Sequence, residues 1–254
     1  MAEEKRPELI PDDVKKVIRD TFLKQLKEPV LIEVYTKQGE NDQYNEATVA
    51  LTKTFSELSD KVKVSFYTVG DDQAKKRNVL RSPTLLIAPD KYRIRYTGSP
   101  LGEEGRSFLV ALMMASTGMS ILTAPAMAKI AAIKDKRDIQ VFVTPTCPYC
   151  PQMARAVYQL ALANPKVHPE VIEVSEFPEL AQRYGVRAVP LTIIADKVAI
   201  PGAVQEQVLV EQLLKAVQSP ALASSEAAGP TSPMSPAPEA PQRGQQRPSG
   251  LVIP

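Results

Sequence analysis

In Val141-Phe-Val-Thr-Pro-Thr-Cys-Pro-Tyr-Cys-Pro151, a short β-branched and aromatic run leads directly into a Cys-x-x-Cys pair. Cys147 and Cys150 are the only two cysteines among 254 residues. If the strand turns into a helix at Cys147, residues three apart lie close together in the first turn, so the two sulfurs can close a small disulfide. The spacing therefore predicts a dithiol redox site.

The start of a helix favours a thiolate, because its free N–H groups and partial positive charge stabilise an anion. We therefore expect Cys147 to be the nucleophile, with a pKa below that of a free cysteine, and Cys150 to be the resolving thiol. Pro148 fits the first helical turn, because its missing N–H would have no helical partner there.

Other interpretations of these thiols are less favoured. A closed zinc site needs four ligands, but the chain has no second cysteine pair and a single histidine, His168. We expect His168 to lie in a solvated loop, between Val167 and Pro169. A cysteine nucleophile with His168 as its base, and a purely structural pair of thiols, remain as alternatives to the dithiol.

A second motif follows about forty residues later, Tyr184-Gly-Val-Arg-Ala-Val-Pro-Leu-Thr-Ile-Ile194, with a later glycine at Gly202. Together with Cys-Pro-Tyr-Cys it resembles the thioredoxin and glutaredoxin fold. The resemblance implies that Pro190 is a cis-proline beside the disulfide and that the backbone of Val189 binds an extended substrate segment by strand addition. Pro148 and Tyr149 would support the same site.

The first half of the chain repeats the order of the second. Strand-like runs occur at 30–36, 62–67 and 80–87, followed by Tyr96-Thr-Gly98. When Ser82-Pro83 is laid over Val189-Pro190, Thr36 falls on Thr144. The cysteine positions then fall near Gly39 and Asp42, so the first copy lacks a dithiol.

The duplication predicts an α/β protein of two tandem thioredoxin-like folds, each with a central mixed β-sheet flanked by helices. We expect one unit at 1–118 without the dithiol and one at 119–218 with it, each long enough to bury its own core. Residues 219–254 are rich in Pro, Ala and Ser, a composition that predicts a disordered tail.

Helical spacing of apolar residues predicts a packing helix over 11–27 and two helices, 106–115 and 121–134, between the copies. The stretch 107–128 carries no charge and is close to membrane-span length. Gly118 and Pro125 interrupt it, so we interpret it as two amphipathic helices rather than a membrane span.

The composition limits the partners. A net charge of +2 and a hydrophobic fraction of 44% give no indication of a nucleic-acid or membrane partner. The N-terminus shows no apolar signal segment, so we expect a cytoplasmic protein. The 11 glycines form no Gly-x-Gly-x-x-Gly after a strand, so we expect no bound cofactor and a separate source of electrons.

A narrower resemblance covers roughly residues 11–218. Two fused units, one carrying Arg95-Tyr-Thr-Gly-Ser-Pro-Leu-Gly102 and the other the Cys-Pro-Tyr-Cys site, resemble the glutaredoxin-like protein disulfide oxidoreductases of archaea and thermophilic bacteria. The resemblance implies an enzyme that reduces or exchanges protein disulfides, with a thioredoxin-reductase-like flavoprotein as electron donor. Many members carry a dithiol in both units, from which this chain departs.

Two alternatives stay open. An inactive copy followed by an active one also resembles the N-terminal region of the flavoprotein component of alkyl hydroperoxide reductase, which would make the dithiol an electron relay to a peroxiredoxin. A protein of a different class, a non-catalytic docking adaptor, would instead use the inactive copy and the tail to recruit partners.

Thioredoxins usually carry a buried carboxylate six residues before the nucleophile, where it helps to deprotonate the resolving thiol. Val141 occupies that position here and cannot accept a proton. Glu173, on an expected strand 171–174, is a candidate replacement by analogy of fold. We expect it to face solvent at a sheet edge, however, and do not include it among the site residues.

Overall fold

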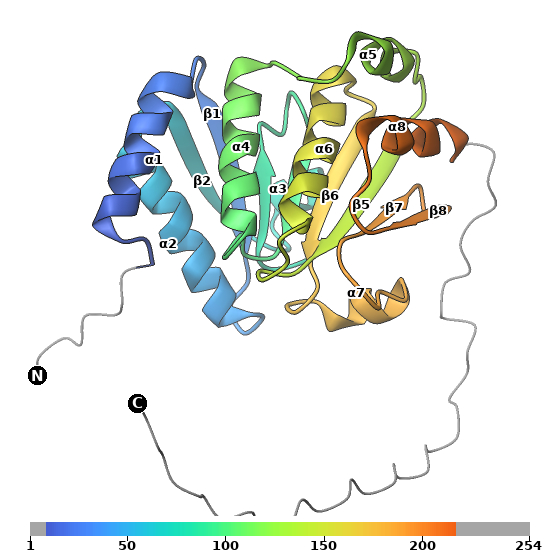
Figure 1. The fold of residues 1–254 in the computed structure, drawn as a ribbon. Helices are drawn as coiled ribbons and strands as arrows, with labels where there is room; N and C mark the ends of the chain where they lie inside the picture. The colour runs from blue at the N-terminus through green and yellow to red at the C-terminus, as the bar shows by residue number, and fades with distance from the viewer. Residues whose placement is uncertain (1–8, 217–254) are drawn as a thin grey trace, which may run out of the picture.

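One eight-stranded mixed β-sheet runs through residues 9–216, the part of the chain that the computed structural model describes (Figure 1). The strand order is β2-β1-β3-β4-β6-β5-β7-β8. The strands are β1 (Val30–Thr36), β2 (Val62–Thr68), β3 (Thr84–Ile87), β4 (Ile94–Thr97), β5 (Arg137–Val143), β6 (Val167–Glu173), β7 (Leu191–Ile194) and β8 (Val198–Pro201). The helices are α1 (Asp12–Gln25), α2 (Asp42–Leu58), α3 (Asp72–Arg77), α4 (Glu104–Thr117), α5 (Ala124–Ala131), α6 (Cys150–Ala163), α7 (Pro178–Arg183) and α8 (Glu206–Lys215).

The two halves of the sheet have the same topology. β1 pairs in parallel with β2 and antiparallel with β3, which pairs antiparallel with β4. β5 repeats this pattern with β6, β7 and β8. Parallel pairing of β4 with β6 joins the halves. The expected α/β duplication with a mixed sheet flanked by helices is confirmed.

The halves share one core, which differs from the expectation that each copy buries its own. The longer helices α1, α2, α4 and α6 lie together over one face of the sheet (Figure 1), and a single apolar cluster under them extends from Phe22 in α1 to Leu213 in α8. Two smaller clusters lie on the other face, under α3 and α7. Because β4 and β6 close the sheet into one, the helices of both halves cover the same continuous surface.

The register corrects the alignment of the copies by one residue. Tyr35 pairs with Thr84 in the first half, as Phe142 pairs with Leu191 in the second, so Thr36 corresponds to Val143 and not to Thr144. Residues 37–41 connect β1 to α2, whereas residues 144–149 connect β5 to α6, so the first connection is one residue shorter. Asp42 begins α2 as Cys150 begins α6.

The two proline motifs have the same surroundings. Both the Ser82–Pro83 and the Val189–Pro190 peptide bonds are cis. The N–H of Gly98 donates to the carbonyl of Pro83 at 2.9 Å, and the N–H of Gly202 donates to that of Pro190 at 2.8 Å. Each proline is therefore held next to the strand that follows it in the hairpin.

Helices lie where the apolar spacing predicted them. α1 fills most of 11–27, and α4 and α5 correspond to the helices expected at 106–115 and 121–134. Gly118 ends α4 with a left-handed backbone (φ 67°) and donates its N–H to the carbonyl of Met114. Within residues 9–216 no helix combines the length and the apolar character needed to cross a membrane. The expected tail, 219–254, lies outside the described residues, and the division at residue 118 stays a prediction.

Candidate active site

A disulfide joins Cys147 and Cys150, with the two Cα atoms 5.5 Å apart. Cys147 retains 7% exposure, whereas Cys150 is fully buried. Both sulfurs border the main apolar core on the side of α6. The structure therefore shows the oxidised pair, with only one of the two cysteines open to solvent.

The helix begins later than the sequence suggested. α6 starts at Cys150, and Cys147 lies in the turn before it. The N–H of Cys150 donates to the Sγ of Cys147 at 3.1 Å, so the sulfur takes one of the N–H groups that the first helical turn leaves free. Pro151, rather than Pro148, occupies the first helical turn. The sulfur of Cys147 still lies at the positive end of the helix.

The other predicted site residues surround this turn. Pro148 and Tyr149 are exposed, with Tyr149 at 65%. Val189 is half-buried and Pro190 is buried at the entry to β7. Since β7 pairs with β5 through Leu191 and Phe142, the cis-proline lies beside the end of the strand that leads to Cys147.

The first half of the chain positions the cysteine turn. The N–H of Glu103 donates to the carbonyl of Pro145 at 2.9 Å. Gly102 has a left-handed backbone (φ 58°), and a Cβ there would lie 2.4 Å from the same carbonyl oxygen. Only glycine permits so close an approach with that backbone conformation. The start of α4 is thus fixed against the turn that holds the dithiol.

Glu104, the first residue of α4, was not identified from the sequence. Its carboxyl is buried, its Oε2 accepts a hydrogen bond from Ser107 Oγ, and its Oε1 has no partner among residues 9–216. Burial raises the pKa of Glu104 to about 7, although Ser107 and the charge of Arg155 favour the ionised form. Burial and the charge of Glu104 raise the pKa of Tyr158, which lies on α6 eight residues after Cys150. The local sequence, in which Glu103 precedes it and Arg106 follows, does not distinguish Glu104 from an exposed glutamate.

Glu173 is buried, which corrects the expectation that it faces solvent at a sheet edge. It ends β6, is 1% exposed, and accepts hydrogen bonds from the N–H groups of Ser175 and Glu176. β6 is an interior strand because it pairs with β4 on one side and β5 on the other. Glu173 therefore fixes the turn after β6.

Glu176 is a second buried acid at the junction of the two halves. Its Oε1 accepts a hydrogen bond from the N–H of Ser99 at 2.8 Å, and its Oε2 has no partner among the described residues. Burial raises the pKa of Glu176 to about 8, and the charge of Glu173 acts in the same direction. Nothing in the local sequence distinguishes this residue from an exposed glutamate.

In the first half, a polar network occupies the position of the dithiol. Asn45 Nδ2 donates to the carbonyls of Lys37 and Glu40 at 3.0 and 2.7 Å. Ser82 Oγ donates to Asn45 Oδ1 and accepts from the N–H of Lys37, each at 2.7 Å. Hydrogen bonds thus fix the 37–41 connection, where the second half has a disulfide.

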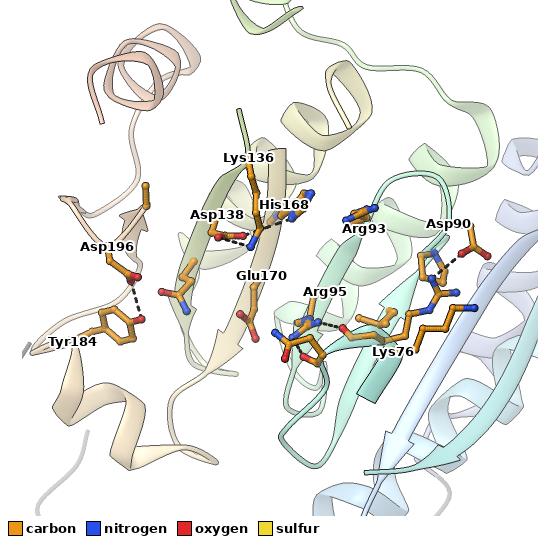
Figure 2. A pocket seen from close by; sticks show the side chains of 17 residues that line it. Lys76, Asp90, Arg93, Arg95, Lys136, Asp138, His168, Glu170, Tyr184 and Asp196 are labelled. Carbon is orange, nitrogen blue, oxygen red and sulfur yellow. Dashed lines mark hydrogen bonds and ion pairs between the residues drawn. The ribbon is translucent and has the colours of Figure 1, made fainter. Parts of the chain in front are cut away.

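A groove lies away from the cysteines, on the face of the sheet that α3 and α7 cover (Figure 2). It has a volume of about 610 Å³ and is lined mostly by polar and charged side chains from both halves. His168 lies there, on β6 and not in a loop, with its Nδ1 3.7 Å from Asp138 Oδ1. Burial lowers the pKa of His168 despite that carboxylate. His168 is therefore placed on a different face from the dithiol, since Cys147 and Cys150 border the core under α6.

Sequence comparisons agree with this geometry. A family model described as "Thioredoxin domain" matches residues 137–215. A thioredoxin from Methanocaldococcus jannaschii is 40% identical over 81 residues, which cover 32% of this chain and 95% of that protein. AhpF, a component of alkyl hydroperoxide reductase, from Escherichia coli is 25% identical over 179 residues, 69% of this chain and 32% of that protein. The chain thus spans about a third of the length of that larger relative.

Solved structures match both halves together. A protein disulfide oxidoreductase from Aeropyrum pernix superposes with a TM-score of 0.75 at 26% identity, covering 82% of this chain and 94% of the other. The N-terminal domain of AhpF from Enterococcus faecalis gives 0.72 at 25% identity, covering 80% and 99%. The chain belongs to the thioredoxin family, as a thioredoxin-like disulfide oxidoreductase with a close cysteine pair in its second half.

Proposed function

We propose that the chain reduces or exchanges protein disulfides, with Cys147 as the nucleophile and Cys150 as the resolving thiol. The observation that carries this assignment is the asymmetry of the pair. Cys147 is the cysteine that retains exposure, and its sulfur receives the N–H of Cys150 at the start of α6. Both features favour a reactive thiolate at Cys147.

The exchange takes place in two steps. In the first, the Cys147 thiolate attacks one sulfur of a substrate disulfide, which forms a mixed disulfide and releases the other substrate sulfur as a thiolate that takes up a proton. In the second, Cys150 loses its proton and attacks the Sγ of Cys147. The Cys147–Cys150 disulfide forms, and the second substrate sulfur leaves. Two electrons pass from the dithiol to the substrate.

Four further residues are proposed to hold the substrate. Pro148 and Tyr149 are exposed beside Cys147, where a partner's surface would touch them. Within residues 9–216 the backbone N–H and carbonyl of Val189 make no backbone hydrogen bond, which leaves both free for an added strand. Pro190, whose peptide bond with Val189 is cis, is buried next to this backbone at the entry to β7.

Glu104 is the proposed proton acceptor for the resolving thiol, in the role that Val141 cannot fill. Its helix is hydrogen-bonded to the cysteine turn through Glu103 and Pro145, and its carboxyl has a pKa of about 7. A base whose pKa lies near the working pH can both accept and return a proton.

Oxidation and reduction of the pair need a partner. We propose a thioredoxin-reductase-like flavoprotein as electron donor and a cytoplasmic setting, where disulfides are usually catalytic or transient. We also propose the division into units at 1–118 and 119–218, since Gly118 ends the last helix of the first half.

The second candidate is an electron relay to a peroxiredoxin. The match to AhpF over both halves supports it, together with the absence of a dithiol from the first half. The chemistry at Cys147 and Cys150 is the same in both cases, so the two proposals differ only in the protein that receives the electrons.

Trapping the mixed disulfide tests the proposed roles. The Cys150→Ser variant should accumulate mixed disulfides with protein substrates through Cys147, and Cys147→Ser should lose dithiothreitol-driven insulin reduction. Substitutions at Gly39 and Asp42 serve as controls and should barely change the rate. Insulin reduction that persists in Cys147→Ser would overturn the assignment of the nucleophile, and a protein that traps nothing would be the docking adaptor.

A further inference from the structure

The first half keeps a pocket at the position that corresponds to the substrate site of the second half. The pocket has a volume of about 460 Å³. Its walls include the residues just before cis-Pro83 and the end of the 37–41 connection, which correspond to the residues before cis-Pro190 and to the cysteine turn. The remaining wall comes from the second half, at the start of α7.

We propose that this pocket is a docking site, without redox chemistry, for an extended segment of a partner protein that carries a basic side chain two residues from an apolar one. The inference rests on the proposed function in one respect only: the partner is taken to be a protein on which the neighbouring dithiol acts.

Charge indicates the basic side chain. Glu40 and Glu179 line the pocket and are exposed, with 47% and 63% of their side chains accessible. Their present partners, Lys37 and Arg81, are themselves partly or largely exposed, and the Glu179–Arg81 contact is long at 3.9 Å. Such surface ion pairs contribute little, so an incoming Lys or Arg can exchange for them at small cost.

The apolar contact comes from Leu80. Its side chain is 72% exposed on the wall of the pocket, two residues before Ser82. An incoming apolar side chain that packs on Leu80 would remove this exposed area from water. Because alternate residues of an extended segment point to the same side, one segment can place an apolar side chain on Leu80 and a basic one near Glu179.

Backbone pairing at this pocket is partly blocked. The carbonyl of Ser82, which corresponds to that of Val189, already accepts a hydrogen bond from Asn41 Nδ2 at 3.0 Å. Asn41 therefore takes the place of a donor that an added strand would supply. Recognition in the first half consequently depends on side chains, in contrast to the backbone pairing proposed at Val189.

The position of the pocket suits a shared substrate. β1 and β5 run in the same direction, because the pairings β1–β3, β3–β4, β4–β6 and β5–β6 contain two antiparallel and two parallel steps. The connections that follow β1 and β5 therefore lie at the same end of the strands, where α2 and α6 both begin (Figure 1). A protein bound at the first half would therefore extend along the end of the sheet where Cys147 lies.

The test measures peptide binding in full-length chain with Cys147→Ser and Cys150→Ser, so that no mixed disulfide contributes. Two labelled ten-residue peptides are compared by fluorescence anisotropy, one with Lys two residues from Leu and one with Glu in place of that Lys. The basic peptide should bind at least about three-fold more tightly, and raising the salt concentration should remove most of the difference.

Matched variants locate the binding. Glu179→Gln and Leu80→Ser should each weaken binding of the basic peptide about two- to five-fold. Glu57→Gln, at the far end of α2, and Leu23→Ser, whose side chain is also 72% exposed, should leave it unchanged. Equal binding of the two peptides, no binding, or equal losses in the control variants would overturn the docking site.

A redox assay separates this proposal from the proposed function. In the chain with both cysteines, Glu179→Gln and Leu80→Ser should reduce a small disulfide such as 5,5′-dithiobis(2-nitrobenzoate) at the unchanged rate, because they lie outside the dithiol site. Normal rates with unaltered peptide binding would reject the docking site and leave the oxidoreductase in place.

Discussion

The two cysteines differ in what can reach them. Cys147 keeps a small exposed area at the start of α6, whereas Cys150 is enclosed by the core and has no exposed area. A substrate disulfide can therefore approach only Cys147. Cys150 must lose a proton without contact with solvent, and Glu104 is the buried carboxyl that we propose for this step.

Glu104→Gln should slow the second step of exchange, because the amide cannot accept the proton of Cys150. With a pKa of about 7, Glu104 is ionised above neutral pH, so the rate of the normal protein should rise through that range and the variant should lack the rise. The rate of this second step is measured by stopped-flow as the mixed disulfide resolves, from mildly acidic to mildly alkaline pH. A variant with the same pH profile would exclude Glu104 as the base.

Gly102→Ala should distort the cysteine turn. An alanine Cβ would approach the Pro145 carbonyl oxygen to 2.4 Å, and its backbone would be held at φ 58°. Gly185→Ala is the matched control, because Gly185 has nearly the same φ, 61°, with no atom within 4 Å of the added Cβ. We expect a larger loss of stability for Gly102→Ala than for the control, by more than about 1 kcal/mol, and altered alkylation of reduced Cys147. Equal effects of the two substitutions would show that the close contact is unimportant.

At the scale of elements, the connection between the first strand and the first long helix of each half determines what that half can do. In the second half it holds a disulfide between residues of the turn and of α6. In the first half the shorter connection is held by Asn45 and Ser82, both buried. The same strand and helix arrangement is thus stabilised in one half by a covalent bond and in the other by hydrogen bonds.

Asn45→Ala should destabilise the first half, because it removes the donor to the carbonyls of Lys37 and Glu40 and leaves the Ser82 hydroxyl without its acceptor. A loss of about 1 to 3 kcal/mol in the free energy of unfolding is expected. Gln43→Ala, an exposed position on the same helix, is the control. Urea denaturation measures both, and a loss below about 0.5 kcal/mol, within the usual range for surface substitutions, would contradict a structural role for the network.

The sequence predicted the local features and missed those that depend on contacts between distant residues. The Cys-x-x-Cys pair, the strand runs and the duplication are visible because each depends on neighbours along the chain. The start of α6 was placed three residues early, since the hydrogen bond from the Cys150 N–H to the Cys147 sulfur cannot be read from residue types. Glu104 is buried on α4, which packs against α6 of the second half. The burial of Glu173 and the place of His168 on an interior strand follow from the pairing of β4 with β6. That pairing joins residues more than seventy positions apart.

At the scale of the whole molecule, one sheet and one core connect a half that carries a dithiol to a half that does not. The two halves pack closely at their junction, since a Cβ on Gly98, at the end of β4, would lie 2.7 Å from the Cβ of Glu173 at the end of β6. Buried carboxyls lie next to this junction, so its stability should respond to pH.

The free energy of unfolding should fall as the pH rises from about 5 to about 8. Glu104 and Glu176 hold their protons in the folded chain up to pH values near 7 and 8, whereas in the unfolded chain they ionise at ordinary carboxyl values. The unfolded state therefore binds fewer protons in this range, and each group lowers stability by roughly 1 to 3 kcal/mol across it. Glu104→Gln and Glu176→Gln should each flatten the decline in chemical denaturation series. Unchanged slopes in both variants would show that these carboxyls are ionised in the folded chain at neutral pH.

An equilibrium titration of Cys147 and Cys150 against defined thiol buffers, read by alkylation and intact mass, tests whether this pair is a centre of thiol–disulfide exchange. We predict one reversible two-electron transition in the normal chain and its loss in Cys147→Ser and in Cys150→Ser. A midpoint near or below about −220 mV would fit a reductase supplied by a separate flavoprotein, and a much higher midpoint would fit an oxidant. A pair that does not interconvert between dithiol and disulfide in any buffer would contradict the assignment of this site as the centre of thiol–disulfide exchange.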